Sequence, residues 1–251
     1  MRDDPCRCCC GLSQIHLAQG RRMFVRGVAA SLLATPTLLT RSTRAADPTP
    51  KTTLNSDQVL RLLKEGNEQF RMEAPFRAAQ GRERRMELAR GQAPFCVVIG
   101  CSDSRVPPEL LFGRGLGELF VIRNAGNTVD LAALGSIEYG VEVLGCPLVV
   151  VLGHESCGAV AAAVEVVQKN ATFPGVIGEM IQPIIPAVLS VRRPNGEVVL
   201  DDAVTANAKR VAARLKSQSA VVQAALRQNS LKIVAARYDL DAGHVDWFED
   251  V

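Results

Sequence analysis

The sequence predicts an α/β protein with a mostly parallel central β-sheet flanked by helices. Unbroken apolar runs at residues 95–99, 119–122 and 148–152 have the length of strands, and helical patterns separate them. Strands that are apolar along their whole length are typical of parallel sheets, because helices cover both faces of such sheets. The chain of 251 residues is 47% hydrophobic, which suits one globular domain with an additional segment.

The additional segment is the N-terminus. Arg21 and Arg22 precede an apolar stretch at residues 28–39, and a Thr-Arg-Ala-Ala cleavage region follows at 43–46. This order is typical of a signal peptide, and the stretch is too short to span a membrane as a mature helix. The paired arginines favour the twin-arginine route, which exports folded proteins. We therefore expect residues 1–46 to be a signal peptide and the mature protein to be exported to the periplasm; a disordered basic leader is the alternative.

The mature part begins with a Pro/Thr-containing linker at residues 47–55 and continues as one domain at residues 56–251. From Ser56 onward, apolar residues recur at spacings of three and four, which predicts an amphipathic helix with Ser56 as its N-cap. A highly charged second helix is expected at residues 82–90. The first helix forms an N-terminal arm ahead of the first strand.

The remaining elements alternate between strands and helices, as in other α/β domains. The apolar runs predict strands at residues 94–100, 119–123, 147–153 and 231–237, with a final edge strand at 243–248. Helical patterns occupy the intervals at residues 130–144, 158–169 and 201–228. The last of these patterns indicates either one long helix or two abutting helices.

Composition excludes several classes of protein. Four of the eight cysteines, Cys6, Cys8, Cys9 and Cys10, fall in the predicted signal peptide, which leaves too few for a disulfide-dense scaffold. The formal net charge is +3, and no basic stripe with interleaved aromatic residues occurs, so nucleic acid is not an expected partner. No stable membrane span is expected in the mature part.

Two short motifs carry the chemistry: CSDSR at residues 101–105 and GHESCG at residues 153–158. Each follows a predicted strand, and open α/β sheets build their sites at the carboxyl ends of strands. A lone cysteine at such a position is usually a core residue. The spacing of His154 and Cys157, however, lets one turn direct both side chains at one ion, and Cys101 adds a third ligand. Two thiolates and an imidazole with an open fourth position are the make-up of a catalytic zinc site.

The first motif also contains an acidic residue, Asp103, and a basic residue, Arg105. Such a pair can form a bidentate hydrogen bond in which the arginine keeps the carboxylate ionised and oriented. A carboxylate held in this way can accept a hydrogen bond from a zinc-bound hydroxide, or can ligate the zinc itself. The alternative interpretation of the pair is a structural salt bridge that stabilises the loop.

These motifs together resemble those of the β-class carbonic anhydrases. The resemblance extends to VPPE at residues 106–109, FVIRNAGN at 120–127, IEY at 137–139 and YDLD at 238–241. It implies an α/β fold with a parallel sheet and one Zn²⁺ per subunit. It also implies a homodimer or a higher even oligomer, in which the N-terminal helical arm packs on the partner subunit.

The resemblance further implies roles for individual residues. Cys101, His154 and Cys157 match the zinc ligands. Asp103 and Arg105 match the catalytic pair beside the metal, and Asp103 would become the fourth zinc ligand only in a closed state at low pH.

Five other residues match positions that contact substrate in the family. Gln92 matches a glutamine that hydrogen-bonds substrate in the plant-like subclass, and the Gly158 N–H matches a donor to bicarbonate. Phe120, Ala125 and Tyr139 match residues that line a narrow apolar pocket, partly contributed by the partner subunit. Gln92 together with Tyr139 favours the plant-like subclass over the bicarbonate-gated one.

The expected function is the zinc-dependent, reversible hydration of carbon dioxide to bicarbonate and a proton, by attack of a zinc-bound hydroxide. A hydrolase of carbon disulfide or carbonyl sulfide on the same site is one alternative. A non-catalytic zinc-binding protein is another, although storage of a metal needs no Asp103–Arg105 pair.

Overall fold

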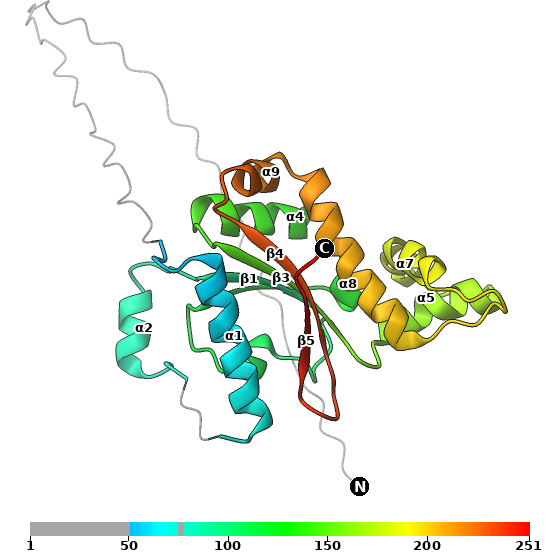
Figure 1. Cartoon of the computed structure of the whole chain (residues 1–251), viewed down its shortest axis with the longest axis horizontal. Coiled ribbons are helices and arrows are strands. Elements are labelled where there is room, and N and C mark those ends of the chain that lie inside the picture. The colour runs from blue at the N-terminus through cyan, green and yellow to red at the C-terminus, as the bar shows by residue number, and fades with distance from the viewer. Residues whose placement is uncertain (1–50, 75–77) are drawn as a thin grey trace, which may run out of the picture. The chain divides into compact units, whose positions relative to one another are not determined.

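The computed structural model describes residues 51–74 and 78–251, so the predicted signal peptide and most of the linker lie outside the described residues. Five strands form one sheet in the order β2-β1-β3-β4-β5 (Figure 1). The first four pair in parallel, and β5 pairs antiparallel with β4. The predicted mostly parallel sheet is therefore confirmed. The strands are β1 (Cys96–Gly100), β2 (Leu119–Arg123), β3 (Leu148–His154), β4 (Lys232–Tyr238) and β5 (Val245–Phe248).

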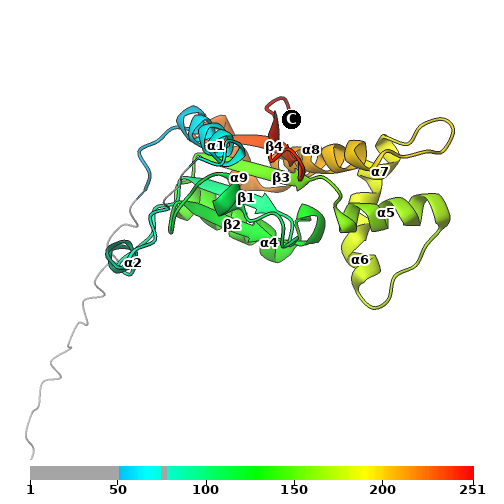
Figure 2. The same cartoon turned by 90° about the horizontal axis from the view of Figure 1, so that it is seen from below.

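Helices cover both faces of this sheet. On one face, α1 (Ser56–Arg71) and the short α3 (Pro108–Leu111) pack on apolar residues of β1, β3 and β4. On the opposite face lie α4 (Leu131–Glu138), α8 (Leu200–Gln218) and α9 (Ala220–Arg227). Figure 2 shows α1 and α4 on opposite sides of the strands. The charged helix α2 (Arg82–Leu88) buries no residue.

The helical arm begins one residue earlier than the sequence suggested. Asn55, and not Ser56, is the N-cap: its side chain accepts a hydrogen bond from the Gln58 N–H, and the Gln58 side chain accepts one from the Asn55 N–H. This reciprocal capping box satisfies two backbone donors, which a Ser56 cap would not do here. The apolar face of α1 packs on its own sheet through Val59 and Leu63.

Two predicted helices are each divided. The pattern at residues 130–144 forms α4 and then a π-helical turn at Tyr139–Val143, where Gly140 packs so closely on Val97 that a Cβ would lie 2.6 Å from its side chain. The pattern at residues 201–228 forms two abutting helices. They separate at Ser219, which has extended backbone angles and caps α9 by accepting a hydrogen bond from the Val222 N–H.

Beyond the carboxyl ends of the strands, a group of helices forms a third apolar cluster with the start of α8 (Figure 2). These are α5 (Gly158–Lys169), α6 (Ile177–Ile181), a 3₁₀ turn at Gln182–Ile184 and α7 (Ile185–Ser190). No element was predicted between residues 170 and 200. Across residues 51–74 and 78–251, no helix has the length and apolar character needed to cross a bilayer.

The strand order places a topological switch point between β1 and β3. After β1 the chain moves to β2 on one side, and it then returns to form β3 on the other side of β1. Crevices at such switch points, outside the carboxyl ends of the strands, are where open α/β sheets bind ligands. Cys101 directly follows β1, and His154 ends β3.

The close approach of α1 to α3 gives a test of this packing. A Cβ at Gly66 would lie 1.9 Å from the backbone oxygen of Phe112, whereas one at Gly135 on α4 would meet nothing within 4 Å. We expect Gly66→Ala to lower the free energy of unfolding by about 1–3 kcal/mol or more, because the backbone must move. Gly135→Ala, the matched control, should raise it by up to about 1 kcal/mol. Urea titration followed by circular dichroism measures both, and equal stability of the two variants would contradict this packing.

Candidate metal centre

The structure brings the three predicted metal ligands together at the switch point. Cys101 follows β1, His154 closes β3, and Cys157 is the N-cap of α5. Their ligand atoms all lie within 4.8 Å of one another, the two sulfur atoms being 4.0 Å apart, and all three residues are buried. Within the described residues, no other group of three histidine, cysteine or acidic side chains gathers in this way.

His154 presents one nitrogen to this group. Its Nδ1 lies 2.8 Å from the Glu155 carbonyl oxygen, which can only accept, so Nδ1 carries the proton and donates it. Its Nε2 therefore carries a free lone pair, and this atom is buried without a hydrogen-bond partner among the described residues. A buried polar atom without a partner is costly, and metal-binding histidines commonly have this arrangement. Nε2 is thus a ligand atom suited to a metal ion.

The two thiols are electrostatically coupled. A hydrogen bond from Cys157 lowers the pKa of Cys101, against the effect of burial, and the Gly126 N–H lowers it further. The same hydrogen bond, with burial, raises the pKa of Cys157. Without a cation, ionisation of both buried thiols is therefore unfavourable. A divalent cation stabilises both thiolates, so the donor set fits a zinc ion held by two thiolates and an imidazole.

Asp103 and Arg105 form the expected bidentate pair. Arg105 Nε and Nη2 donate to Asp103 Oδ1 and Oδ2 at 2.9 and 2.8 Å, and the Arg105 N–H donates to Oδ1 at 3.0 Å. The Arg105 side chain holds the pKa of Asp103 well below its usual range, so the carboxylate stays ionised. Asp103 Oδ2 lies 3.9 Å from His154 Nε2. An oriented acceptor therefore stands directly beside the metal ligands.

Arg123, at the end of β2, also belongs to the centre. Its Nε donates to the Cys101 carbonyl oxygen at 2.8 Å, and its Nη2 donates to the Asp103 carbonyl oxygen. It thus holds the loop that carries both a metal ligand and the carboxylate. From the sequence, only the position of Arg123 at the end of a predicted strand could be inferred. Its contact with the loop after β1 could not, because that contact depends on β2 lying beside β1.

Only some of the residues expected to contact substrate lie beside the centre. The rings of Phe120 and Tyr139 pack on each other with centroids 6.1 Å apart, but Phe120 pairs with Val97 in the amino-terminal half of β1, whereas Cys101 follows the carboxyl end of that strand. Ala125 lines a surface pocket of about 420 Å³ that begins at Ser102, next to the first metal ligand. Gly158 opens α5 directly after Cys157, and Gln92 is exposed in the loop before β1. Nothing within the described chain joins Gln92 to the other four.

An α/β fold with a Cys₂His centre at its switch point defines a mononuclear zinc enzyme. A family model for carbonic anhydrase matches residues 96–245. Carbonic anhydrase 2 of Mycobacterium tuberculosis is 42% identical over 181 residues, which cover 72% of this chain and 87% of that protein.

Solved structures agree with this match. A Coccomyxa β-carbonic anhydrase in complex with acetazolamide is 30% identical, with a TM-score of 0.56 over 64% of this chain and 74% of that one. One of two tetrameric β-carbonic anhydrases from Sordaria macrospora is 25% identical, with a TM-score of 0.57 over 65% of this chain and 84% of that one. The chain belongs to the β-class of the carbonic anhydrase family.

Removal of a single sulfur tests the metal centre. We expect Cys101→Ala to lose most of the zinc that the wild-type protein binds, because two protein ligands then remain of three. Cys146→Ala is the matched control: this thiol is also buried and free, but its sulfur donates to the Pro94 carbonyl oxygen. Elemental analysis of purified protein measures the zinc, and full occupancy in Cys101→Ala would contradict the assignment.

Proposed function

We propose that this protein catalyses the reversible hydration of carbon dioxide to bicarbonate and a proton. The observation that carries the proposal is the ionised, oriented carboxylate of Asp103 beside the buried Cys₂His group. Cys101, His154 and Cys157 would hold one zinc ion, which supplies hydroxide near neutral pH by lowering the pKa of bound water. The names of the family relatives support the same reaction.

The roles of Asp103 and Arg105 follow from their hydrogen bonds. Because Arg105 keeps the carboxylate ionised, Asp103 can only accept, so a reacting water or hydroxide must donate its hydrogen to Asp103. That orientation turns an oxygen lone pair away from Asp103 and towards the substrate carbon. Arg105 is itself fixed by a further bond to the Ser156 carbonyl oxygen at 3.3 Å. Detachment of Asp103 from Arg105 to become the fourth metal ligand at low pH is part of the same proposal.

We assign the substrate contacts on the basis of the family resemblance. Phe120, Ala125 and Tyr139 would line the apolar pocket for carbon dioxide, and Gln92 and the Gly158 N–H would donate to substrate oxygens. Under this assignment, Gln92 and Tyr139 favour the plant-like subclass. Hydrolysis of carbon disulfide or carbonyl sulfide is not favoured, since the matched relatives are named carbonic anhydrases. Simple metal storage does not account for the Asp103–Arg105 pair.

Substitution of Asp103 separates catalysis from metal binding. We expect Asp103→Asn to keep its zinc but to lower kcat for carbon dioxide hydration by about 10²–10⁴-fold, because the amide can donate and no longer fixes the proton. Asp57→Asn, a change at an exposed aspartate on α1, is the control. Stopped-flow hydration assays with parallel zinc analysis measure both effects, with acetazolamide inhibition as a check of the site. Wild-type turnover in Asp103→Asn would exclude this mechanism.

We infer that this protein forms an even oligomer, because the Sordaria relative is tetrameric. In the described chain, Leu131 is 87% exposed, and Tyr139 and Val143 on the same helical segment are also exposed apolar residues. Burial of these side chains between two subunits would favour a homodimer or a pair of dimers. We expect Leu131→Glu to shift the molar mass from light scattering towards the monomer. An unchanged molar mass would exclude α4 from the subunit interface.

Export through the twin-arginine route is the proposal for the N-terminus. Metal insertion before export would protect the thiolates from oxidation in the periplasm. We expect the double substitution of Arg21 and Arg22 by lysine to leave active, unprocessed enzyme in the cytoplasm. Cell fractionation measures the location of the protein, and N-terminal sequencing measures its processing. Because lysine keeps the positive charge, the substitution tests the arginines themselves and not the charge of the segment. Processed protein outside the cytoplasm at the wild-type level would rule out the route.

A further inference from the structure

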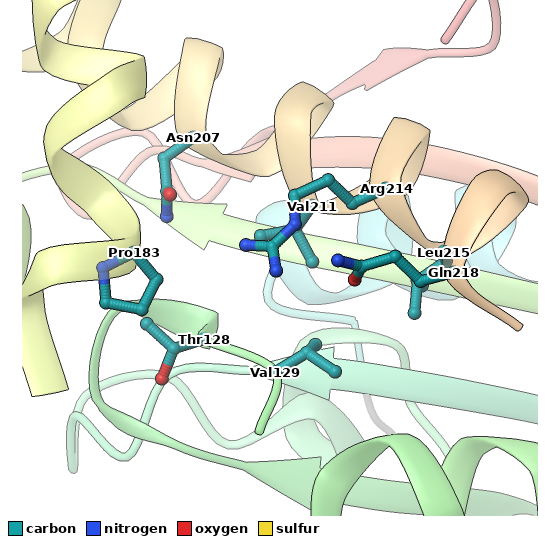
Figure 3. Close-up of a pocket in the computed structure, with 8 residues that line it drawn as sticks. All are labelled: Thr128, Val129, Pro183, Asn207, Val211, Arg214, Leu215 and Gln218. Carbon is teal, nitrogen blue, oxygen red and sulfur yellow. The ribbon is translucent and has the colours of Figure 1, made fainter. Parts of the chain in front are cut away.

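One polar side chain interrupts the apolar face of α8. The buried positions of this helix are otherwise apolar, namely Ala203, Val204, Ala208, Val211, Ala212 and Leu215, but Asn207 is only 1% exposed. Burial of an amide is unfavourable unless it forms hydrogen bonds. Asn207 Nδ2 donates to the Gly126 carbonyl oxygen at 2.9 Å. Figure 3 shows this side chain extending from α8 beside Pro183, towards the segment that carries Thr128.

Gly126 is the residue that connects this contact to the metal centre. Its N–H donates to the Cys101 sulfur at 3.2 Å. Its φ is +65°, and a Cβ there would lie 2.6 Å from Ile184 Cδ1 and 3.1 Å from Ala159 Cβ. The turn at residues 125–127 is therefore confined by packing on one side and by Asn207 on the other. Its N–H can keep its direction towards the sulfur only while this turn keeps its position.

The same face of α8 also supports the second ligand-bearing segment. Gly153 precedes His154, and a Cβ at Gly153 would lie 3.1 Å from Val204 and 3.5 Å from Ala208. One helix thus packs directly on β3 beside the histidine and hydrogen-bonds to the turn beside the first cysteine. Hydrogen bonds around metal ligands commonly tune both affinity and electronic structure.

We infer that Asn207 is a positioning residue for the metal centre, which acts on Cys101 by fixing the Gly126 peptide whose N–H donates to the sulfur. This role rests on the metal site of the proposed function. Loss of the Asn207 amide would free the turn and weaken the N–H···S bond. The sulfur would then donate more charge to the metal, whereas the segment that carries Cys101 would be held less firmly in place, so the metal would be released more readily.

The test replaces Asn207 by Leu, which has the same branching, is somewhat larger and has no donor. The Co²⁺-substituted protein should show its sulfur-to-cobalt charge-transfer band at longer wavelength than in the wild-type protein. Zinc should also pass to a chelator about 10-fold faster or more, as expected for loss of such a supporting hydrogen bond. If Asn207→Leu does not fold, Asn207→Ala removes the same donor without adding branched carbons.

The matched control is the same substitution at Asn67, another buried asparagine. Its side chain bonds to the backbone of Leu111, Gly243 and Val245, and none of these hydrogen bonds reaches a metal ligand or the turn at residues 125–127. Asn67→Leu should lower Tm at least as much, yet leave the cobalt band and zinc release unchanged. An unshifted band and wild-type zinc release in the Asn207 variant would overturn the inference. A wild-type protein that shows no sulfur-to-cobalt band would instead overturn the metal site itself.

Discussion

The organisation of this protein depends on a group of buried ligand atoms that need a positive charge. Two buried sulfurs lie 4.0 Å apart, and a buried imidazole nitrogen beside them has no hydrogen-bond partner in the described chain. Desolvation makes such an arrangement costly for the protein alone. A divalent cation offsets that cost, because both sulfurs can then bind it as thiolates. The surrounding hydrogen bonds are arranged around this requirement.

Each ligand is held by a different part of the fold. Arg123 fixes the carbonyl oxygen of Cys101, the Glu155 carbonyl oxygen fixes the His154 ring, and the first turn of α5 directs N–H groups at Cys157. Helix N-termini stabilise thiolates because their free N–H groups carry partial positive charge. Asp103 is fixed separately by Arg105. The carboxylate can therefore be substituted without disturbing the ligands, which is why metal binding and turnover can be examined apart.

The sheet and the metal ligands were predictable because their signals are local. Apolar runs mark the strands, and the motifs directly follow two of them. The helices between residues 170 and 200 could not be predicted in this way. They are short, contain Pro183 and Pro186, and are stabilised by packing on α5 and α8. Arg123 and Asn207 were missed for a related reason. Their partners lie on a neighbouring strand or on a distant turn, and only the tertiary structure brings them together.

The two cysteines of the centre lie 56 positions apart in the chain, on segments joined only through the pairing of β1 with β3. An unfolded chain cannot hold all three ligands around one ion without first closing that long loop. The ion is therefore a ligand of the native state, and its binding free energy adds to the stability of the whole domain. Zinc supply thus affects the folded fraction of the chain, as well as the number of molecules competent for catalysis.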